Sequence, residues 1–174
     1  HRGTANFTVG RIESLMRAAQ RNGWQMCSHV TSDAGVDLVL DALERVNRDK
    51  PVKDWRYTLI HSYFPNETAI RRAAGFGVCV DTQPAWYYKD GDALAKALGE
   101  DRLKHFMGLA DWGKGGLKVA INSDHMHGIG PNKSLNPFNP FLAIYVAVTR
   151  RTESGRIFGS EQSISREQAL RMAT

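Results

Sequence analysis

The sequence predicts an α/β protein built on a parallel sheet, and three observations support this fold class. Short apolar runs alternate with stretches of helical periodicity from residue 9 onward, which is the pattern of strand–helix–strand units. The chain contains no internal linker and no low-complexity segment. Its 174 residues are 42% hydrophobic and 24% charged, as in ordinary globular domains that bury one sizeable core.

The first half of the chain predicts an opening helix and then two strands, each followed by a helix. Over 9–21, apolar residues recur at the spacing of one helix face. The runs WQMCSHV (24–30) and WRYTLIHS (55–62) are short, apolar and bounded by turn residues, as strands are. Asp33 is expected to cap the helix after the first strand, and the dipeptide at 65–66 opens the helix after the second.

The second half repeats this order with a longer excursion in the middle. GVCVDTQ (77–83) and LKVAINSD (117–124) are the third and fourth expected strands. The segment 84–116 between them holds at least one helix, and a second one is left open. A helix over 141–152 follows the fourth strand, and Ser165 is expected to cap the last helix.

Four consecutive strand–helix units are compatible with two architectures, half of an eightfold barrel or a self-contained open sheet. Periodicity alone does not separate them. A complete barrel needs about 250 residues, more than the 174 present. The chain begins at His1 rather than Met, and it ends at Thr174 inside a helical pattern. We therefore expect a chain truncated at both ends, forming one partial domain over 1–174.

Charge and cysteine content exclude several classes of protein. The net charge is +5, but the basic residues are scattered, and the pairs at 71–72 and 150–151 are interpreted as solvated helix faces. No basic stripe alternates with aromatics, so no nucleic-acid partner is expected. No apolar run approaches the ~18 residues of a membrane span, so no membrane partner is expected, and no signal peptide opens the chain. Cys27 and Cys79 lie in strand-like runs and are interpreted as reduced core thiols, which suits a cytoplasmic protein.

Polar residues suited to metal chemistry stand at the ends of three expected strands. His29 ends the first, His61 the second and Asp124 the fourth, while Asp81 and Gln83 end the third. Each alone has a structural explanation, such as a hydrogen-bonded histidine or a helix-capping aspartate. Because parallel strands gather their carboxyl ends at one edge, the three converge, and two imidazoles with a carboxylate suit a divalent metal. Alternation along both strands predicts that each histidine points to the same interior.

Gln83 and other residues near these strand ends are candidates for substrate contact. His125 and His127 follow the fourth strand and are expected to contact substrate or to support the ligands rather than to bind metal directly. Trp86 follows the third strand and could line a pocket, with aromatic packing as the alternative. Asp33 either contacts substrate or orients a ligand, or simply caps its helix.

Five motifs, in order, resemble the metal-dependent amidohydrolase superfamily, and specifically the amidohydrolase family 3 branch that includes N-substituted formamide deformylases. These motifs are HVTSDAGVDLVLDAL, RYTLIHS, DTQPAWYY, INSDHMHG and ISREQALRMAT, and the resemblance holds in order and spacing from about residue 9 to 174. The usual glycine-aspartate after the first histidine is Ser32-Asp33 in this chain.

The resemblance implies a (β/α)₈ barrel in which the four strands correspond to strands 5–8. It implies that His29, His61 and Asp124 are metal ligands, with Asp124 also the base that accepts a proton from the attacking water. The family's first-strand histidine pair and fourth-strand bridging residue have no counterpart here and are expected upstream, so these residues alone should be inactive.

The sequence therefore predicts a hydrolase that cleaves a non-peptide carbon–nitrogen bond of a small amide or formamide-like substrate. One or two divalent ions, zinc foremost, would be the cofactor. The missing N-terminal half of the barrel would be a partner, and a homodimer is left open. Alternatives are a deaminase or lactone-type hydrolase of the same superfamily, and a non-catalytic α/β domain that binds small molecules.

Overall fold

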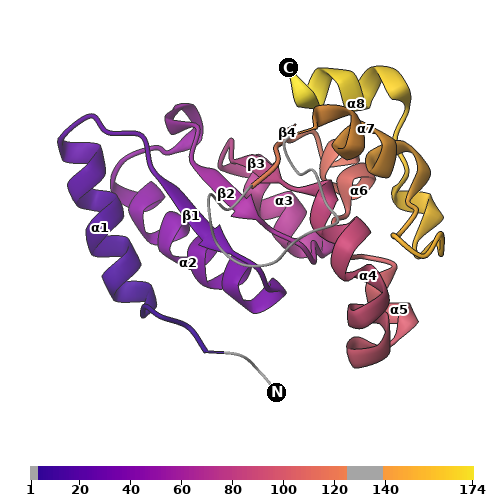
Figure 1. Cartoon of the computed structure of the whole chain (residues 1–174). Helices are drawn as coiled ribbons and strands as arrows, with labels where there is room; N and C mark the ends of the chain where they lie inside the picture. The colour runs from indigo at the N-terminus through magenta and orange to yellow at the C-terminus, as the bar shows by residue number, and fades with distance from the viewer. Residues whose placement is uncertain (1–3, 125–138) are drawn as a thin grey trace.

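The computed structural model describes residues 4–124 and 139–174, and its centre is one parallel sheet (Figure 1). The sheet has four strands in the order β1-β2-β3-β4, which is also their order along the chain. Their bounds are β1 Cys27–Val30, β2 Thr58–His61, β3 Cys79–Thr82 and β4 Lys118–Ile121. The α/β class and the parallel sheet are confirmed, and each strand lies inside its expected run.

Eight α-helices and two short 3-10 helices accompany the sheet in the described residues. They are α1 Val9–Arg21, α2 Asp33–Asp49, η1 Lys53–Trp55, α3 Glu67–Gly75, α4 Pro84–Leu98, α5 Glu100–Leu103, α6 Leu109–Lys114, α7 Pro140–Thr149, η2 Ser160–Gln162 and α8 Arg166–Ala173. The segment 84–116 thus holds three helices where one or two were expected. None of the described helices combines the length and the apolar character needed to cross a membrane.

The two faces of the sheet differ in what covers them. Side chains of one face, including Val30, Leu59 and Val80, are buried in a core that α1, α2 and α3 complete. The opposite face carries residues that are exposed or half-buried, and they are Cys27, His29, Thr58, Ile60, Cys79, Asp81, Lys118 and Ala120. Among the described residues this second face has no covering layer comparable to the helices of the first.

The cysteine prediction is wrong in one respect. Cys27 is exposed and Cys79 half-buried, and both thiols are free. Strand alternation explains this result, because both residues belong to the uncovered face and are in register with Thr58 of β2. They are therefore not core thiols.

The cap of α2 also differs from the expectation. Ser32, not Asp33, is the N-cap, and its hydroxyl accepts a hydrogen bond from the backbone N–H of Gly35 at 3.0 Å. Asp33 is the first helical residue, and its carboxylate accepts from the N–H of Ala34. The expected cap at Ser165 is confirmed, with Gln168 completing a capping box.

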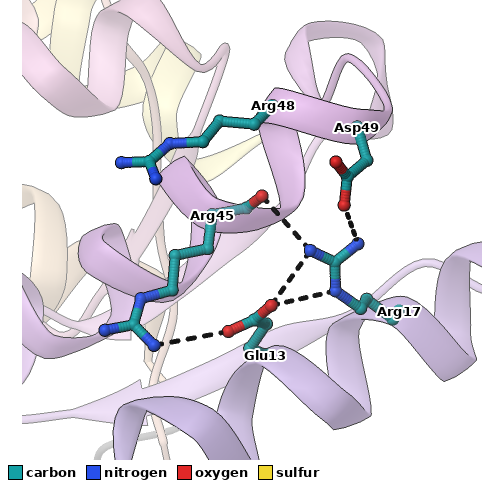
Figure 2. A pocket seen from close by; sticks show the side chains of 5 residues that line it. All are labelled: Glu13, Arg17, Arg45, Arg48 and Asp49. Carbon is teal, nitrogen blue, oxygen red and sulfur yellow. Dashed lines mark hydrogen bonds and ion pairs between the residues drawn. The ribbon is translucent and has the colours of Figure 1, made fainter.

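A polar contact joins α1 to α2 at the surface beside the sheet (Figure 2). The guanidinium of Arg17 lies 2.9 Å from Glu13 and 2.6 Å from Asp49. Arg45 approaches the second oxygen of Glu13 at 3.5 Å, and Arg48 borders the same hollow. Because the two carboxylates already pair with Arg17, this hollow is an inter-helix contact rather than a set of free cations.

The interpretation of Arg150 as a solvated residue is wrong. Its side chain is 1% exposed, and its guanidinium donates to the carbonyls of Phe106, Met107 and Phe158. It also stacks on the ring of Tyr87 at 3.9 Å. Burial lowers the pKa of Arg150 to about 10. The left-handed backbone at Arg150, with φ of 52°, ends α7 and turns the side chain inward, whereas Arg151 is exposed as expected.

Candidate functional site at the strand ends

The carboxyl ends of β1 and β2 bring two of the predicted histidines into contact. The rings of His29 and His61 are edge-to-face, with their centroids 4.3 Å apart. His29 belongs to the uncovered face of the sheet and is exposed, whereas His61 is only 5% exposed. The expected convergence of the two histidines is therefore observed.

The expected reason for that convergence, however, is wrong for His61. Leu59 and Val30 lie on the helix-covered face, and regular alternation would place His61 with them. His61 instead has a φ of 73°, and Ser62 follows with a φ of 48°. This left-handed pair breaks the alternation, so the imidazole turns toward His29.

The imidazole of His61 is held from one side by two groups. Its Nδ1 lies 2.5 Å from Oε1 of Gln83 and 2.9 Å from the hydroxyl of Tyr63. Burial is the main cause that raises the pKa of Tyr63, so its hydroxyl stays neutral. The other nitrogen of His61, Nε2, lies 4.0 Å from Oδ2 of Asp124.

Asp124 is oriented by groups that follow β3 and β4. The indole N–H of Trp86, in the first turn of α4, donates to its Oδ2 at 2.9 Å. The backbone N–H of Asp124 donates to Oδ1 of Asn122 at 2.8 Å. Asp124 has a φ of 44° and its side chain is 37% exposed, so the carboxylate is fixed yet accessible.

Asp81 anchors the network from β3. Its carboxylate accepts a hydrogen bond from the amide of Asn122, and its backbone carbonyl accepts one from Nε2 of Gln83 at 3.3 Å. Burial, the largest cause, raises the pKa of Asp81 despite the hydrogen bond from Asn122. Asp81 thus connects the residues that hold His61 to those that hold Asp124.

The structure separates Asp33 from this network and brings in two residues that the sequence did not single out. Asp33 pairs with Arg102 of α5 at 3.0 Å. Tyr63 and Asn122 were missed, although each stands two residues from a predicted ligand, at the same strand end. His125 and His127 lie outside the described residues.

The donor set supports part of a metal site. His61 is held by a hydrogen bond at Nδ1. Such an outer hydrogen bond is usual for metal-binding histidines, because it leaves the lone pair of Nε2 available to a metal ion. Asp124 and His29 lie beside it. No group of three or more His, Cys, Asp or Glu residues in 4–124 and 139–174 is close enough to hold an ion unaided. The residues present therefore fit a site that needs further ligands.

The chain is similar over nearly its whole length to known proteins. The sequence model of the Amidohydrolase family matches residues 1–174. The chain is 27% identical over 171 residues to the putative amidohydrolase YtcJ of Bacillus subtilis, covering 96% of this chain and 30% of that protein. It is 25% identical over 176 residues to N-substituted formamide deformylase of Arthrobacter pascens, covering 100% of this chain and 31% of that protein.

A solved structure shows the same fold. An uncharacterized metal-dependent hydrolase of Pyrococcus horikoshii OT3 superposes with a TM-score of 0.78 at 18% identity, over 99% of this chain and 32% of that one. The chain thus spans about a third of the length of the proteins that it matches. Because the family model covers the whole sequence, the chain belongs to the amidohydrolase family.

Proposed function

We propose that this chain is part of a metal-dependent hydrolase that cleaves a non-peptide carbon–nitrogen bond in a small amide or formamide-like substrate. The observation that most supports this proposal is that His29, His61 and Asp124 lie together at one end of a parallel sheet. Membership of the amidohydrolase family supports the reaction class, and the likeness to the formamide deformylase supports the substrate class.

In this proposal His29 and His61 hold a divalent ion, zinc foremost, together with Asp124 and with ligands from outside the chain. When bound, such an ion polarises the substrate carbonyl and lowers the pKa of water toward ~7. Asp124 accepts a proton from the attacking water and delivers it to the leaving nitrogen as the carbon–nitrogen bond breaks. Trp86 keeps Oδ2 of that carboxylate in place, and its half-buried ring borders the substrate.

We further propose that the chain, as one partial domain over 1–174, forms about half of a (β/α)₈ barrel. Within the described residues β1 and β4 each pair with a strand on one side only, and one face of the sheet is uncovered. In a closed barrel that face becomes the packed interior, and both free edges find partners. The missing half would supply the other ligands, so these residues alone are expected to be inactive. A cytoplasmic location and a homodimer stay predictions.

Elemental metal analysis of the natural full-length protein tests the proposed site. We expect one or two zinc-like ions per chain in the wild type, and their loss or strong depletion in the His29→Ala/His61→Ala double variant. His105→Ala is the matched control, because His105 is 59% exposed and lies beside Asp111 in a hollow between α3 and α6 that contains none of the proposed ligands. Full metal occupancy in the double variant would contradict the ligand assignment.

Absence of metal from the folded wild type, even after addition of zinc or manganese, would favour the small-molecule-binding domain instead. Where metal is found, a substrate series separates the enzymes. Turnover of amides and formamides supports the proposal. Turnover of lactones alone would indicate a lactone-type hydrolase, and turnover of exocyclic amines alone would indicate a deaminase.

A further inference from the structure

Gln83 is built into the site in a way that leaves it no free polar atom for a substrate. It stands between β3 and α4, at the N-cap position of α4, yet its side chain makes no capping bond there. The residue is 1% exposed. Its Oε1 faces Nδ1 of His61, and its Nε2 faces the backbone carbonyl of Asp81. Gln83 therefore has no accessible polar atom with which to make the expected substrate contact.

The orientation of this amide determines where the proton of His61 lies. Only the NH₂ end of Gln83 can face the carbonyl of Asp81, because two oxygens there would repel each other. Oε1 must then face His61, and an amide oxygen can only accept a hydrogen bond. Nδ1 of His61 therefore carries the proton and donates it to Gln83, which leaves the lone pair on Nε2.

We propose that Gln83 is a positioning residue that fixes the proton of His61 on Nδ1 and so directs the lone pair of Nε2 toward Asp124. The proton location follows from this chain alone, whereas its use in holding a metal rests on the proposed function. Asp81, which accepts the hydrogen bond of Gln83, also accepts one from the amide of Asn122. The side-chain oxygen of Asn122 in turn accepts a hydrogen bond from the backbone N–H of Asp124. Gln83 thus aligns the imidazole with the frame that positions the carboxylate.

Tyr63 is the competing group, which makes the proposal testable. Its hydroxyl also lies within hydrogen-bond distance of Nδ1 and can either accept or donate. With Gln83 in place the hydroxyl serves as a second acceptor. Without Gln83 it can donate to a bare Nδ1, and the proton of the imidazole then moves to Nε2.

The test is nuclear magnetic resonance of the metal-free, full-length protein with ¹⁵N-labelled histidine, at alkaline pH where imidazoles are neutral. The His61 signals are identified by their loss in His61→Asn. We expect the wild type to be protonated on Nδ1 and Gln83→Leu to shift His61 toward protonation on Nε2. Tyr63→Phe should leave the proton on Nδ1. Gln162→Leu is the matched control, since Gln162 is equally buried but bonds to Asp111.

A wild-type proton on Nε2, or an unchanged tautomer in Gln83→Leu, would overturn the proposal. A change in Tyr63→Phe but not in Gln83→Leu would also overturn it and assign the role to Tyr63. A second readout is zinc affinity, which should fall about 10–100-fold in Gln83→Leu and stay unchanged in Gln162→Leu. If the wild type binds no zinc, the proposed function fails, but the tautomer still decides the role of Gln83.

Discussion

His29 and His61 both lie near the carboxyl end of their strands, but the structure gives them different surroundings. His61 is buried, bonded through Nδ1 to Gln83 and Tyr63, and carried on left-handed backbone. His29 is exposed on the uncovered face, where its ring packs edge-to-face with that of His61. One imidazole is therefore fixed by this chain, while the other is left exposed by the described residues.

The contrast divides the site into two parts. The fixed part contains His61, which hydrogen bonds hold in place, and the adjustable part contains His29, which the described residues leave exposed. Asp124 belongs with His61, because Trp86 and Asn122 hold it within the same network. In the proposed barrel, the fixed part would set the geometry, and His29 would adjust to ligands from the other half. Substitutions on the two sides should accordingly differ in kind.

The largest expected effect is on turnover and comes from Asp124, in the fixed part of the site. In the full-length protein Asp124→Asn keeps the shape of the side chain and the acceptor for Trp86 but removes the proton carrier. We expect turnover to fall by about 10²–10⁴-fold, with an unchanged melting temperature. Asp54→Asn is the control, since Asp54 is exposed before β2, at the other end of the strands. Turnover within a few-fold of wild type would remove Asp124 from proton transfer.

A second contrast between like residues, Arg150 and Arg151, predicts an effect on stability. Arg150→Ala deletes a buried side chain and removes one hydrogen-bond donor from each of the carbonyls of Phe106, Met107 and Phe158. We expect the free energy of unfolding to fall by about 2–4 kcal/mol. Arg151→Ala should change it by less than about 0.5 kcal/mol, because Arg151 is exposed. Urea titration measures both, and equal values would show that burial does not distinguish them.

The smallest expected effect compares the two histidines directly, in metal-free full-length protein. His61→Ala leaves the buried Oε1 of Gln83 without its donor, which should cost about 1–3 kcal/mol of unfolding free energy. His29→Ala removes a ring that makes no hydrogen bond within the described residues, so it leaves no buried polar group there without a partner and should cost less than His61→Ala. Thermal or chemical denaturation of both variants checks the order. A larger loss of unfolding free energy in His29→Ala than in His61→Ala would mean that His29, not His61, is the histidine held by its surroundings.

Much of the fold could be predicted from sequence because local patterns determine it. The spacing of apolar residues located α1 at its observed bounds, and the turn residues located all four strands. The strand-end position of His61 and Asp124 predicted their proximity. Ser32 was missed as a cap because a serine and an aspartate in succession are both good N-caps, and only the backbone decides between them.

The remainder depends on contacts between distant residues. The left-handed φ of His61 overrides strand alternation, and no pattern in the run YTLIHS indicates it. The inward turn of Arg150 depends on carbonyls more than 40 positions earlier in the chain, which local periodicity cannot register. Gln83 was correctly located at the site, but its two hydrogen bonds, not its position, reveal whether it faces a substrate or a histidine.

The left-handed residues at His61, Ser62 and Asp124 also bear on how quickly the site can be filled. Such conformations cost free energy for residues other than glycine and persist only where the surrounding structure enforces them. Here that cost arises once, as the chain folds, so in the proposed function an arriving ion or substrate would meet a backbone that is already bent to shape. Association would then be limited by diffusion and dehydration rather than by slow rearrangement of the strand ends.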